Sequence, residues 1–389
     1  MKNYRSIGAC DVALGPLTFL VGPNGSGKSN FLDALRFVAD SLNQSLDHAL
    51  RDRGGIGEVR RRSTGHPTHF GIRVDFRLDS GHGHYAFEIG AGSSGSWSVK
   101  REDCAVYPVG GRLVAYEVED GTVRVFTPAP EQPPPAVADR LFLVNAAGHP
   151  PFRAVFDGLS RMGFYNLNPD AMRELQPVDS SYLLKRDGSN VASILARLEN
   201  RPESKRRLVE YLGKIVPGVL DVEHKSFSSR ETVEFRQQVH GAKGAWHFPA
   251  QNMSDGTIRA LGVLLALHQT GNGLPIPLVG IEEPETALHP GASGVLLDSL
   301  RDAASRMQVI VTSHSGDLLN DKEVPDESIL AVVAEENQTR IGPLDQAGRE
   351  AMREHLYTAG ELLRMNQLIP DPAASGPRQM DLFVDSPLP

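Results

Sequence analysis

Cysteine is scarce in this sequence of 389 residues, which contains Cys10 and Cys104 and no other cysteine. No cysteines or histidines show the paired spacing of a zinc site, and two distant cysteines cannot form a framework of disulfides. Such cysteine usage is typical of a reducing compartment, so we expect a cytoplasmic protein.

Long apolar runs and an excess of positive charge are absent as well. The longest nearly apolar stretch, residues 261–267, is far shorter than the ~20 residues needed to cross a bilayer, and the N-terminus lacks the apolar core of a signal peptide. The formal net charge is -8, which excludes attraction of the whole surface to nucleic acid or to anionic membranes. Any contact with DNA must therefore use local basic patches.

What the sequence does contain is a glycine-rich loop between a predicted strand and a predicted helix. Residues 17–21 form a short β-prone apolar run, and apolar residues recur at helical spacing from Phe31 onward. The loop between them, GPNGSGKS at residues 22–29, fits the phosphate-loop pattern in full. This strand, loop and helix context favours a phosphate site over a plain glycine turn.

The loop predicts a set of contacts with a nucleotide. Backbone N–H groups at the start of the helix would surround the β-phosphate, Lys28 would contact the β- and γ-phosphates, and the Ser29 hydroxyl would bind Mg²⁺. The residues expected to bind the nucleotide are Gly22, Asn24, Gly25, Ser26, Gly27, Lys28, Ser29 and Asn30.

Two further strand patterns end in side chains suited to hydrolysis. Residues 277–281 form an apolar strand followed by Glu282 and Glu283, and residues 309–313 form a β-branched strand followed by His314. Because ligand sites of open α/β sheets lie at the carboxyl ends of strands, we expect Glu282 to bind Mg²⁺ and Glu283 to deprotonate the attacking water. His314 would sense the γ-phosphate. An acidic turn alone is usually solvated and a lone histidine is usually structural, but the phosphate loop favours the catalytic interpretation.

A fourth segment, MSDGT at residues 253–257, precedes an apolar helical pattern at residues 258–268. By itself Ser254 is best explained as the N-cap of that helix. Taken in chain order, however, the phosphate loop, MSDGT, IEEPE at residues 281–285 and TSH at residues 312–314 resemble the motifs of the ABC ATPase superfamily. They correspond to its phosphate loop, signature, carboxylate strand and histidine switch.

This resemblance implies an α/β fold, a P-loop NTPase of ABC type with a β-rich nucleotide lobe, a signature lobe and a mainly helical insertion. It also implies ATP and Mg²⁺ as cofactors, ATP hydrolysis, and a homodimer joined head to tail. In such a dimer Ser254, Asp255 and Gly256 of one subunit would contact the nucleotide held by the other, at the positive end of the following helix. The catalytic residues implied are Lys28, Glu283 and His314.

Within this superfamily, Asp255 and Glu282 look like the RecF, SMC and OLD-type branch of DNA-associated and defence ATPases. The resemblance implies ATP-driven dimerisation coupled to DNA repair or antiviral defence, through DNA or through a separate effector chain such as a nuclease. Two features depart from the family pattern. No glutamine occurs between Gln44 and Gln132, so the residue that replaces the glutamine of the glutamine loop is not identified, and His289 stands where an aspartate usually ends the dimer-contact loop.

Four parts of the chain are expected from these patterns. They are a nucleotide lobe with the phosphate loop and an antiparallel sheet at residues 1–150, a mainly helical insertion at 151–245, a lobe with the signature and the carboxylate strand at 246–368, and a disordered tail at 369–389. A regulatory scaffold with little ATP turnover and the ATPase subunit of a transporter stay open as alternatives. The long separation between Ser29 and Ser254 argues against the transporter.

Two basic runs bear on nucleic acid as a partner. Residues 60–62 are Arg-Arg-Arg and residues 205–207 are Lys-Arg-Arg, in a chain that is acidic overall. Both a contact with a phosphate backbone and a solvated surface explain such runs. Neither run has the interleaved aromatic residues of a single-strand stacking groove, so DNA stays an open partner.

The tail contains one short apolar motif, QMDLF at residues 379–383. It resembles the peptide with which bacterial replication and repair proteins dock on the sliding clamp. A mobile tether that ends in two apolar side chains suits a hydrophobic pocket on a partner. The residues expected to contact a clamp are Gln379, Leu382 and Phe383.

Overall fold

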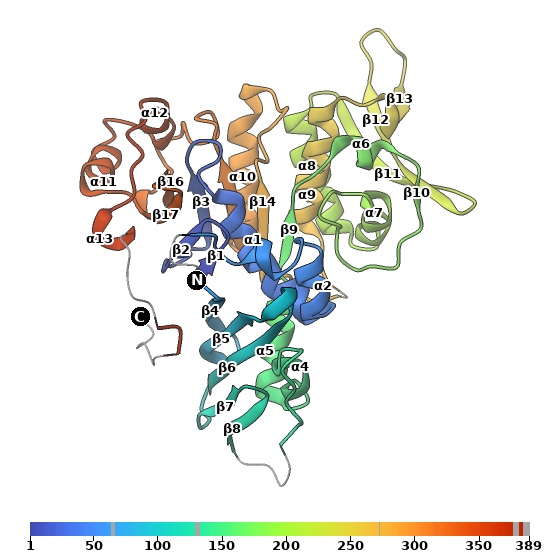
Figure 1. Cartoon of the computed structure of the whole chain (residues 1–389). Helices are drawn as coiled ribbons and strands as arrows, with labels where there is room; N and C mark the ends of the chain where they lie inside the picture. The colour runs from blue at the N-terminus through green and yellow to red at the C-terminus, as the bar shows by residue number, and fades with distance from the viewer. Residues whose placement is uncertain (64–66, 129–132, 272, 376–380, 384–389) are drawn as a thin grey trace.

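The structure is a computed structural model that describes residues 1–63, 67–128, 133–271, 273–375 and 381–383. Within these ranges the largest element is a mixed 13-stranded sheet, on which helices pack (Figure 1). The strand order is β8-β7-β6-β5-β4-β1-β2-β17-β16-β3-β15-β14-β9. This combination of a mixed sheet with helices agrees with the predicted α/β class.

The parallel strands at one end of this sheet are short and buried on both faces. They are β9 (Gly163–Tyr165), β14 (Leu278–Glu282), β15 (Gln308–Ser313), β3 (Leu17–Val21) and β16 (Ile329–Glu335). Neighbouring residues of β3 enter different hydrophobic clusters, Leu20 one and Val21 the other, as the two-residue period of a strand requires. β15 pairs in parallel with both β3 and β14, with Ser313 opposite Val21 and Thr312 opposite Glu282. The carboxyl ends of these strands therefore meet at one edge.

The rest of the large sheet is mainly antiparallel and includes the meander from β4 to β8. Its strands are β1 (Lys2–Tyr4), β2 (Ile7–Ala9), β4 (His69–Leu78), β5 (Gly81–Ala91), β6 (Trp97–Pro108), β7 (Val114–Glu119), β8 (Thr122–Thr127) and β17 (Gln338–Pro343). Figure 1 shows this meander extending from the parallel strands as a separate wing of the molecule.

One buried carboxylate fixes a helix on this wing. Glu102 of β6 accepts hydrogen bonds from the backbone N–H groups of Phe142 (2.6 Å) and Leu143 (2.8 Å), at the start of α4 (Leu143–Ala146). The hydroxyls of Tyr85 and Tyr116 donate to the same carboxylate at 3.1 and 2.8 Å. Burial raises the pKa of Glu102 to about 7, against the opposite effect of these hydrogen bonds. The carboxylate thus provides acceptors for N–H groups that a helix cannot satisfy internally.

Three helices near the parallel strands begin at residues that suit a helix start. α1 (Lys28–Asn43) follows Gly27 of the phosphate loop, and α9 (Asp255–His268) is capped by Ser254. α8 (Pro202–Ile215) begins with a proline in its first turn, where the missing N–H costs no hydrogen bond. The remaining helices include α2 (Leu46–Arg51), α3 (Ile56–Val59), α5 (Pro150–Ser160), α6 (Pro169–Arg173), α7 (Val191–Glu199), α10 (Ser293–Ala304), α11 (Gln346–Arg353), α12 (Ala359–Arg364) and α13 (Pro372–Ser375).

The predicted helical insertion at residues 151–245 contains α5 to α8 but also several strands. β9 joins the large sheet, while β10 (Gln176–Pro177), β11 (Val219–Phe227), β12 (Arg230–Gln238) and β13 (Ala245–Pro249) form a second sheet. Leu195 of α7, Leu212 of α8 and Leu261 of α9 belong to one hydrophobic cluster, which attaches the insertion to α9. The hairpin of β11 and β12 agrees with the half-buried alternation of residues 219–227 and 232–239, whereas β9 and β10 are too short to show such alternation and were not expected.

Part of the segment expected to be a disordered tail packs on the fold. α13 lies beside β17, and residues 381–383 lie on β4. Residues 376–380, including Gln379 of the clamp-like motif, and residues 384–389 lie outside the described ranges.

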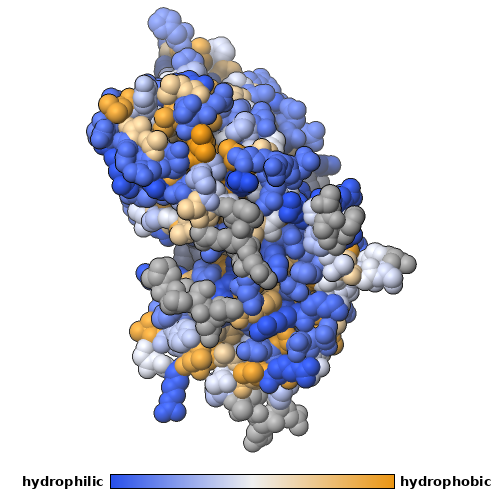
Figure 2. All heavy atoms as spheres, turned by 60° about the vertical axis from the view of Figure 1, so that its left-hand side comes forward, coloured by the Kyte–Doolittle hydropathy of each residue, from blue (hydrophilic) through white to orange (hydrophobic). Residues whose placement is uncertain are grey.

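The face of the molecule shown in Figure 2 is mainly hydrophilic. On the face shown in Figure 2, hydrophobic residues form small groups among hydrophilic ones. The large exposed apolar side chains include Phe227 of β11 and Trp246 of β13. None of the helices in the described ranges combines the length and the apolar composition needed to span a membrane.

Candidate functional site

The phosphate loop joins β3 to α1 in a backbone conformation that requires glycine. Gly25 and Gly27 have φ angles of 78° and 105°, in the left-handed region that side chains disfavour. A Cβ added to Gly27 would lie 2.0 Å from Oγ1 of Thr339, and one added to Gly22 would lie 2.0 Å from the carbonyl O of Val332. The position of the loop is therefore fixed by close packing against β16 and β17.

Two side chains of the loop have polar groups suited to an anion. The Lys28 Nζ donates to the carbonyl groups of Gly22 (2.7 Å) and Pro23 (3.0 Å). Burial lowers the pKa of Lys28, and the carboxylate of Glu283 acts in the opposite direction. The buried hydroxyl of Ser26 has no hydrogen-bond partner among the described residues. Buried donors of this kind normally have partners, so the loop fits a ligand that supplies acceptors.

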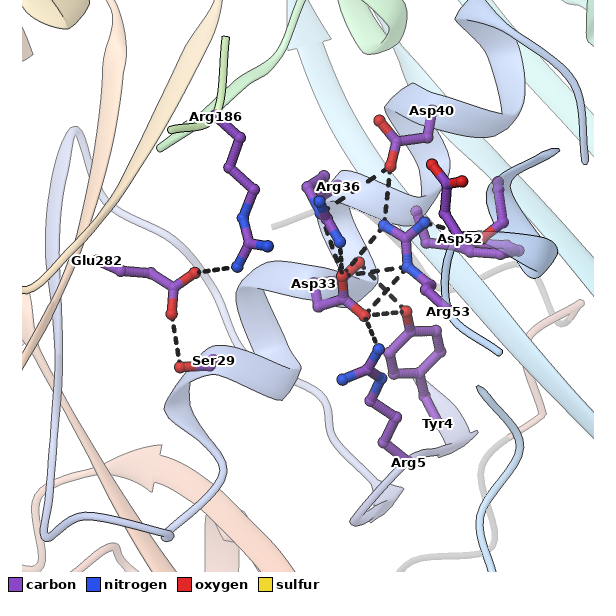
Figure 3. Close-up of polar contacts among 12 residues, drawn as sticks. Tyr4, Arg5, Ser29, Asp33, Arg36, Asp40, Asp52, Arg53, Arg186 and Glu282 are labelled. Atoms are coloured by element: carbon purple, nitrogen blue, oxygen red, sulfur yellow. Dashed lines mark hydrogen bonds and ion pairs between the residues drawn. The ribbon is translucent and has the colours of Figure 1, made fainter. Parts of the chain in front are cut away.

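Ser29 and Glu282 meet across the edge of the sheet, as Figure 3 shows. The Ser29 hydroxyl donates to Glu282 Oε2 at 2.7 Å, and Arg186 Nη2 donates to the other oxygen, Oε1, at 2.9 Å. The hydroxyl and the carboxylate are oxygen donors of the kind that Mg²⁺ prefers. The structure therefore brings together the two residues predicted to bind the metal, and adds a cation that the sequence did not predict there.

Glu283 and His314 lie side by side at the same edge. Glu283 has a φ of 46°, a left-handed conformation that is uncommon outside glycine and is often found at functional sites. Its N–H donates to the carbonyl O of Thr312 at 3.0 Å, which holds the turn against β15. The carboxylate Oε1 lies 3.0 Å from Nδ1 of His314, and the two side chains are 35% and 40% exposed, so both remain accessible to a ligand.

A buried arginine that was not predicted from the sequence donates hydrogen bonds to the turn at Glu282 and Glu283. Arg259 of α9 donates through Nη2 to the carbonyl groups of Glu282 (3.2 Å) and Glu283 (3.1 Å), and through Nη1 to that of Leu167 (2.9 Å). One signal was present in the sequence, because a charged residue inside an apolar helix must find polar partners. Arg259 thus links the helix after MSDGT to the carboxylate turn.

The MSDGT segment forms the start of α9. Ser254 is exposed and caps the helix, with its Oγ accepting from the N–H of Thr257 at 3.3 Å. Asp255 forms an ion pair with Arg173 of α6. A Cβ added to Gly256 would lie 2.4 Å from the carbonyl O of Ala287, so the helix start is in direct contact with the loop after Glu283. Within the described part of the chain, the Ser254 hydroxyl hydrogen-bonds to the N–H and the hydroxyl of Thr257, in the first turn of its own helix.

The segment after β9 lies at the same edge, beside the carboxyl end of β14. Tyr165 is paired with Ile281, so the next residue, Asn166, follows at the edge where Glu282 leaves β14. Asn166 is exposed, and its N–H donates to the carbonyl O of Arg186 at 2.9 Å. This position is two strands away from the histidine strand β15, with β14 between them, and no glutamine occupies it. The residue type gave no signal in the sequence.

An aspartate on α1 binds several basic groups one turn beyond Ser29 (Figure 3). Asp33 forms ion pairs with Arg36 at 2.6 Å, Arg5 at 3.0 Å and Arg53 at 3.1 Å, and it accepts from the hydroxyl of Tyr4 at 2.8 Å. Burial alone would raise the pKa of Asp33, but the three guanidinium groups outweigh burial and lower it to about 2. The carboxylate is therefore ionised at neutral pH and holds the N-terminal strands to α1 and α2.

A basic cavity opens beside this cluster and adjoins the phosphate loop through Asn30. Its volume is about 440 Å³, and its lining residues are Arg5, Ser6, Asn30, Arg53, Glu58, Arg60, Arg62 and Asn337. The Asn30 side chain donates to Ser6 Oγ at 2.6 Å, and the Thr339 hydroxyl, 2.7 Å from Ser6 Oγ, donates to the carbonyl O of Ser26 at 2.9 Å. The arginine run at residues 60–62 thus contributes to a cavity next to the phosphate loop.

Three of the other candidate contact residues have partners within the chain. In the run at residues 205–207, Lys205 pairs with Asp221 at 2.9 Å and Arg207 pairs with Asp302 at 3.0 Å. His289 accepts through Nδ1 from the N–H of Gly291 at 3.0 Å. Asn24 is exposed on the phosphate loop. The charges of Lys205 and Arg207 are therefore already balanced by carboxylates.

Comparison with known proteins adds a family, two partial relatives and two similar folds. The chain matches the family described as "AAA domain, putative AbiEii toxin, Type IV TA system" over residues 17–119 and 163–321. It is 53% identical over 54 residues, 14% of each chain, to the DNA replication and repair protein RecF of Vibrio vulnificus (strain YJ016). It is 46% identical over 46 residues to the OLD nuclease of Thermus scotoductus (strain ATCC 700910 / SA-01), covering 12% of this chain and 9% of the nuclease.

The similar folds are heads of Smc proteins. One is an Smc head bound to the C-winged helix domain of ScpA, with a TM-score of 0.55, 16% identity and coverage of 90% of this chain and 97% of that chain. Another is an Smc head with an extended coiled coil bound to the C-terminal domain of ScpA, derived from Pyrococcus furiosus, with a TM-score of 0.51, 13% identity and coverage of 91% and 97%. At this identity the likeness shows the fold alone, and it confirms the predicted α/β fold. The match to RecF spans only 14% of that protein's length.

The Asp33 cluster predicts a pH-dependent loss of stability in the Asp33→Asn variant. The pKa of Asp33 is lowered from 3.8 to about 2 in the folded state, so its stabilising effect is present above about pH 4 and is lost as the pH falls towards 2. A shift of this size corresponds to about 2 kcal/mol. Chemical denaturation at several pH values should therefore show a deficit for Asp33→Asn that is largest above pH 5 and shrinks at lower pH. Asp47→Asn, an exposed partner of Arg51 on α2, is the control, and a deficit independent of pH contradicts the interpretation.

Proposed function

Since the chain belongs to the family described as "AAA domain, putative AbiEii toxin, Type IV TA system", and is an ATPase-type protein of the RecF, SMC and OLD branch, we propose that it binds and hydrolyses ATP in a head-to-tail homodimer. One observation supports this more than any other. Ser29 and Glu282 are joined by a hydrogen bond, and Glu283 lies beside His314 at the same sheet edge as the phosphate loop.

Phosphate binding in this proposal rests on the start of α1 and on Lys28. The backbone N–H groups of residues 25–29 and the positive end of a 16-residue helix attract the β-phosphate. Lys28 exchanges its contacts with the carbonyl groups of Gly22 and Pro23 for phosphate oxygens, and the unpaired hydroxyl of Ser26 supplies a further donor. The basic cavity beside Asn30 suits the remaining phosphate and the ribose end of the nucleotide.

Ser29 and Glu282 hold Mg²⁺ in this proposal. When bound, the ion neutralises the charge that develops on the transferred phosphate. Asn166 follows β9 at the same edge, and we propose that it takes the position that a glutamine occupies in related ATPases. Arg186 must release Glu282 Oε1 before that oxygen can bind a metal.

Glu283 acts as the base and His314 positions it. The exposed carboxylate accepts a proton from the attacking water, while the imidazole Nδ1, 3.0 Å away, keeps the carboxylate oriented towards the phosphate loop. Arg259 donates a hydrogen bond to the carbonyl O of Glu283 and so fixes the backbone that carries the Glu283 side chain. A base that is held in place reduces the reorganisation needed during the reaction.

The second subunit completes the site through its MSDGT segment. Ser254 is exposed, and α9 places the N–H groups of Asp255 and Gly256 at a helix start, where they attract an anion. ATP binding would close the dimer and hydrolysis would open it, so the two subunits would change their relative position. We propose that this change acts on DNA or on a separate effector chain, in DNA repair or antiviral defence. A sliding clamp would bind Gln379, Leu382 and Phe383.

The variant Glu283→Gln tests hydrolysis directly. Removing the base should lower ATP turnover by about 100-fold or more while the phosphate contacts remain. The variant should then accumulate as an ATP-bound dimer, measured by light scattering with and without ATP. Glu327→Gln, at an exposed position away from the site, is the control. An unchanged rate would support the alternative of a scaffold with little turnover.

A mixing experiment tests whether the sites are shared between subunits. Lys28→Ala removes the phosphate contact and Ser254→Arg blocks the signature, so each variant alone should be inactive. In a mixed dimer one site contains an intact Lys28 and the partner's intact Ser254. Equal amounts of the two variants should therefore recover about a quarter of the wild-type rate. Absence of any recovery, with wild-type nucleotide binding retained by Ser254→Arg, contradicts the head-to-tail arrangement.

The ion pair of Arg186 with Glu282 predicts competition with Mg²⁺. In Arg186→Ala the carboxylate loses this cation, so the Mg²⁺ concentration for half-maximal binding of a fluorescent ATP analogue should fall several-fold. Lys185→Ala is the matched control, because the neighbouring Lys185 pairs with Asp179 at 2.5 Å and not with Glu282. An unchanged or higher Mg²⁺ requirement in Arg186→Ala contradicts the competition.

A further inference from the structure

Leu382 and Phe383, near the end of the chain, lie on the antiparallel wing of the large sheet. Leu382 is only 3% exposed, although it comes from a segment with little secondary structure. A Cβ added to Gly71 of β4 would lie 2.4 Å from Cδ1 of Leu382, so this glycine leaves the space that the leucine fills. Leu382 is thus packed against strand β4 of its own chain.

Two arginines bind the same pair of residues. Arg73 Nη1 donates to the carbonyl O of Leu382 at 3.0 Å, and Arg73 is also paired with Asp75 at 2.9 Å, which limits its freedom. The Arg101 guanidinium carbon lies 4.3 Å from the centre of the Phe383 ring, within the range of a cation–π contact. Strand β4 therefore supplies the space and the hydrogen bond, and β6 supplies the cation.

We propose that Gly71, Arg73 and Arg101 form a docking site, here called the tail site, for Leu382 and Phe383 of the same chain. The two apolar side chains are those of the QMDLF motif that the sequence offers to a partner. They cannot occupy the tail site and an external hydrophobic pocket at once, so the tail site withholds them from any partner that reads the motif. Tethering within one chain raises their effective concentration to the millimolar range, so weak contacts suffice for docking.

Titration of a fluorescent peptide with the sequence of residues 376–389 into the full chain tests the tail site. Wild-type protein should bind it at least about tenfold more weakly than Leu382→Ala/Phe383→Ala, because only the variant leaves the site open to a free peptide. Adding Arg101→Ala to this double variant should abolish binding again. Arg124→Ala, an exposed arginine of β8 paired with Glu119, is the matched control and should leave binding intact.

Two outcomes overturn the proposal. Equal binding of the peptide to wild type and to Leu382→Ala/Phe383→Ala, including no binding to either, shows that the tail does not occupy this site. If the peptide binds wild-type protein only after the protein is diluted, the tail docks between two copies, because dilution separates the copies and opens the site. Circular dichroism of every variant separates a lost site from a lost fold. None of these measurements uses nucleotide, so their failure leaves the proposed ATPase function untouched.

A purified sliding clamp gives a second readout of the same site. Arg101→Ala lies outside the motif, so it should strengthen clamp binding by releasing the tail, whereas Leu382→Ala/Phe383→Ala should abolish it. If Arg101→Ala leaves a measurable clamp affinity unchanged, the tail site does not withhold the motif.

Discussion

Parallel pairing of β15 with β3 on one side and β14 on the other positions every candidate catalytic group. Because the three strands run in the same direction, the phosphate loop, the two glutamates and His314 all begin where a strand ends, at one edge. A shift of one residue in register would move side chains to the opposite face and separate Glu282 from Ser29. The hydrophobic clusters on both faces oppose such a shift, since each buries alternate residues of the same strands. The core thus determines the geometry of the site.

Features of the site that depend on a local physical requirement are visible in the sequence. Gly25 and Gly27 adopt left-handed backbone conformations, and the close packing at Gly22 and Gly27 excludes any side chain, so the residue types reveal the loop. The strands that flank the site are predicted within one or two residues because each is an apolar run with a clear end. Ser254 is both the N-cap of α9 and a member of the signature-like motif, so its two interpretations are compatible.

Contacts between segments that are distant in the chain cannot be predicted from a local sequence pattern. Arg186 lies in a polar loop 96 residues from its partner Glu282, and Arg5, Arg53 and Arg60 reach one cavity from separate turns and strands. Asn166 has the role of an edge residue only because β9, three residues long, pairs with β14. A strand of three residues is too short to show a periodic pattern, and a single polar residue shows none. The function of such residues depends on which groups the fold places beside them. The same holds for Leu382, which needs the missing side chain of Gly71.

The contact of Gly256 with Ala287 joins two parts that would serve different nucleotides in a shared-site dimer. In that dimer the start of α9 would face the partner's ATP, whereas the loop after Glu283 would contact the ATP bound by its own chain. Since a Cβ added to Gly256 would overlap the carbonyl O of Ala287, and Arg259 hydrogen-bonds from the same helix to Glu282 and Glu283, a displacement at one nucleotide would be passed to the other in the proposed dimer. In the proposed dimer, two sites built in this way would sense each other's occupancy through one helix, and alternating hydrolysis would follow from the packing within each subunit.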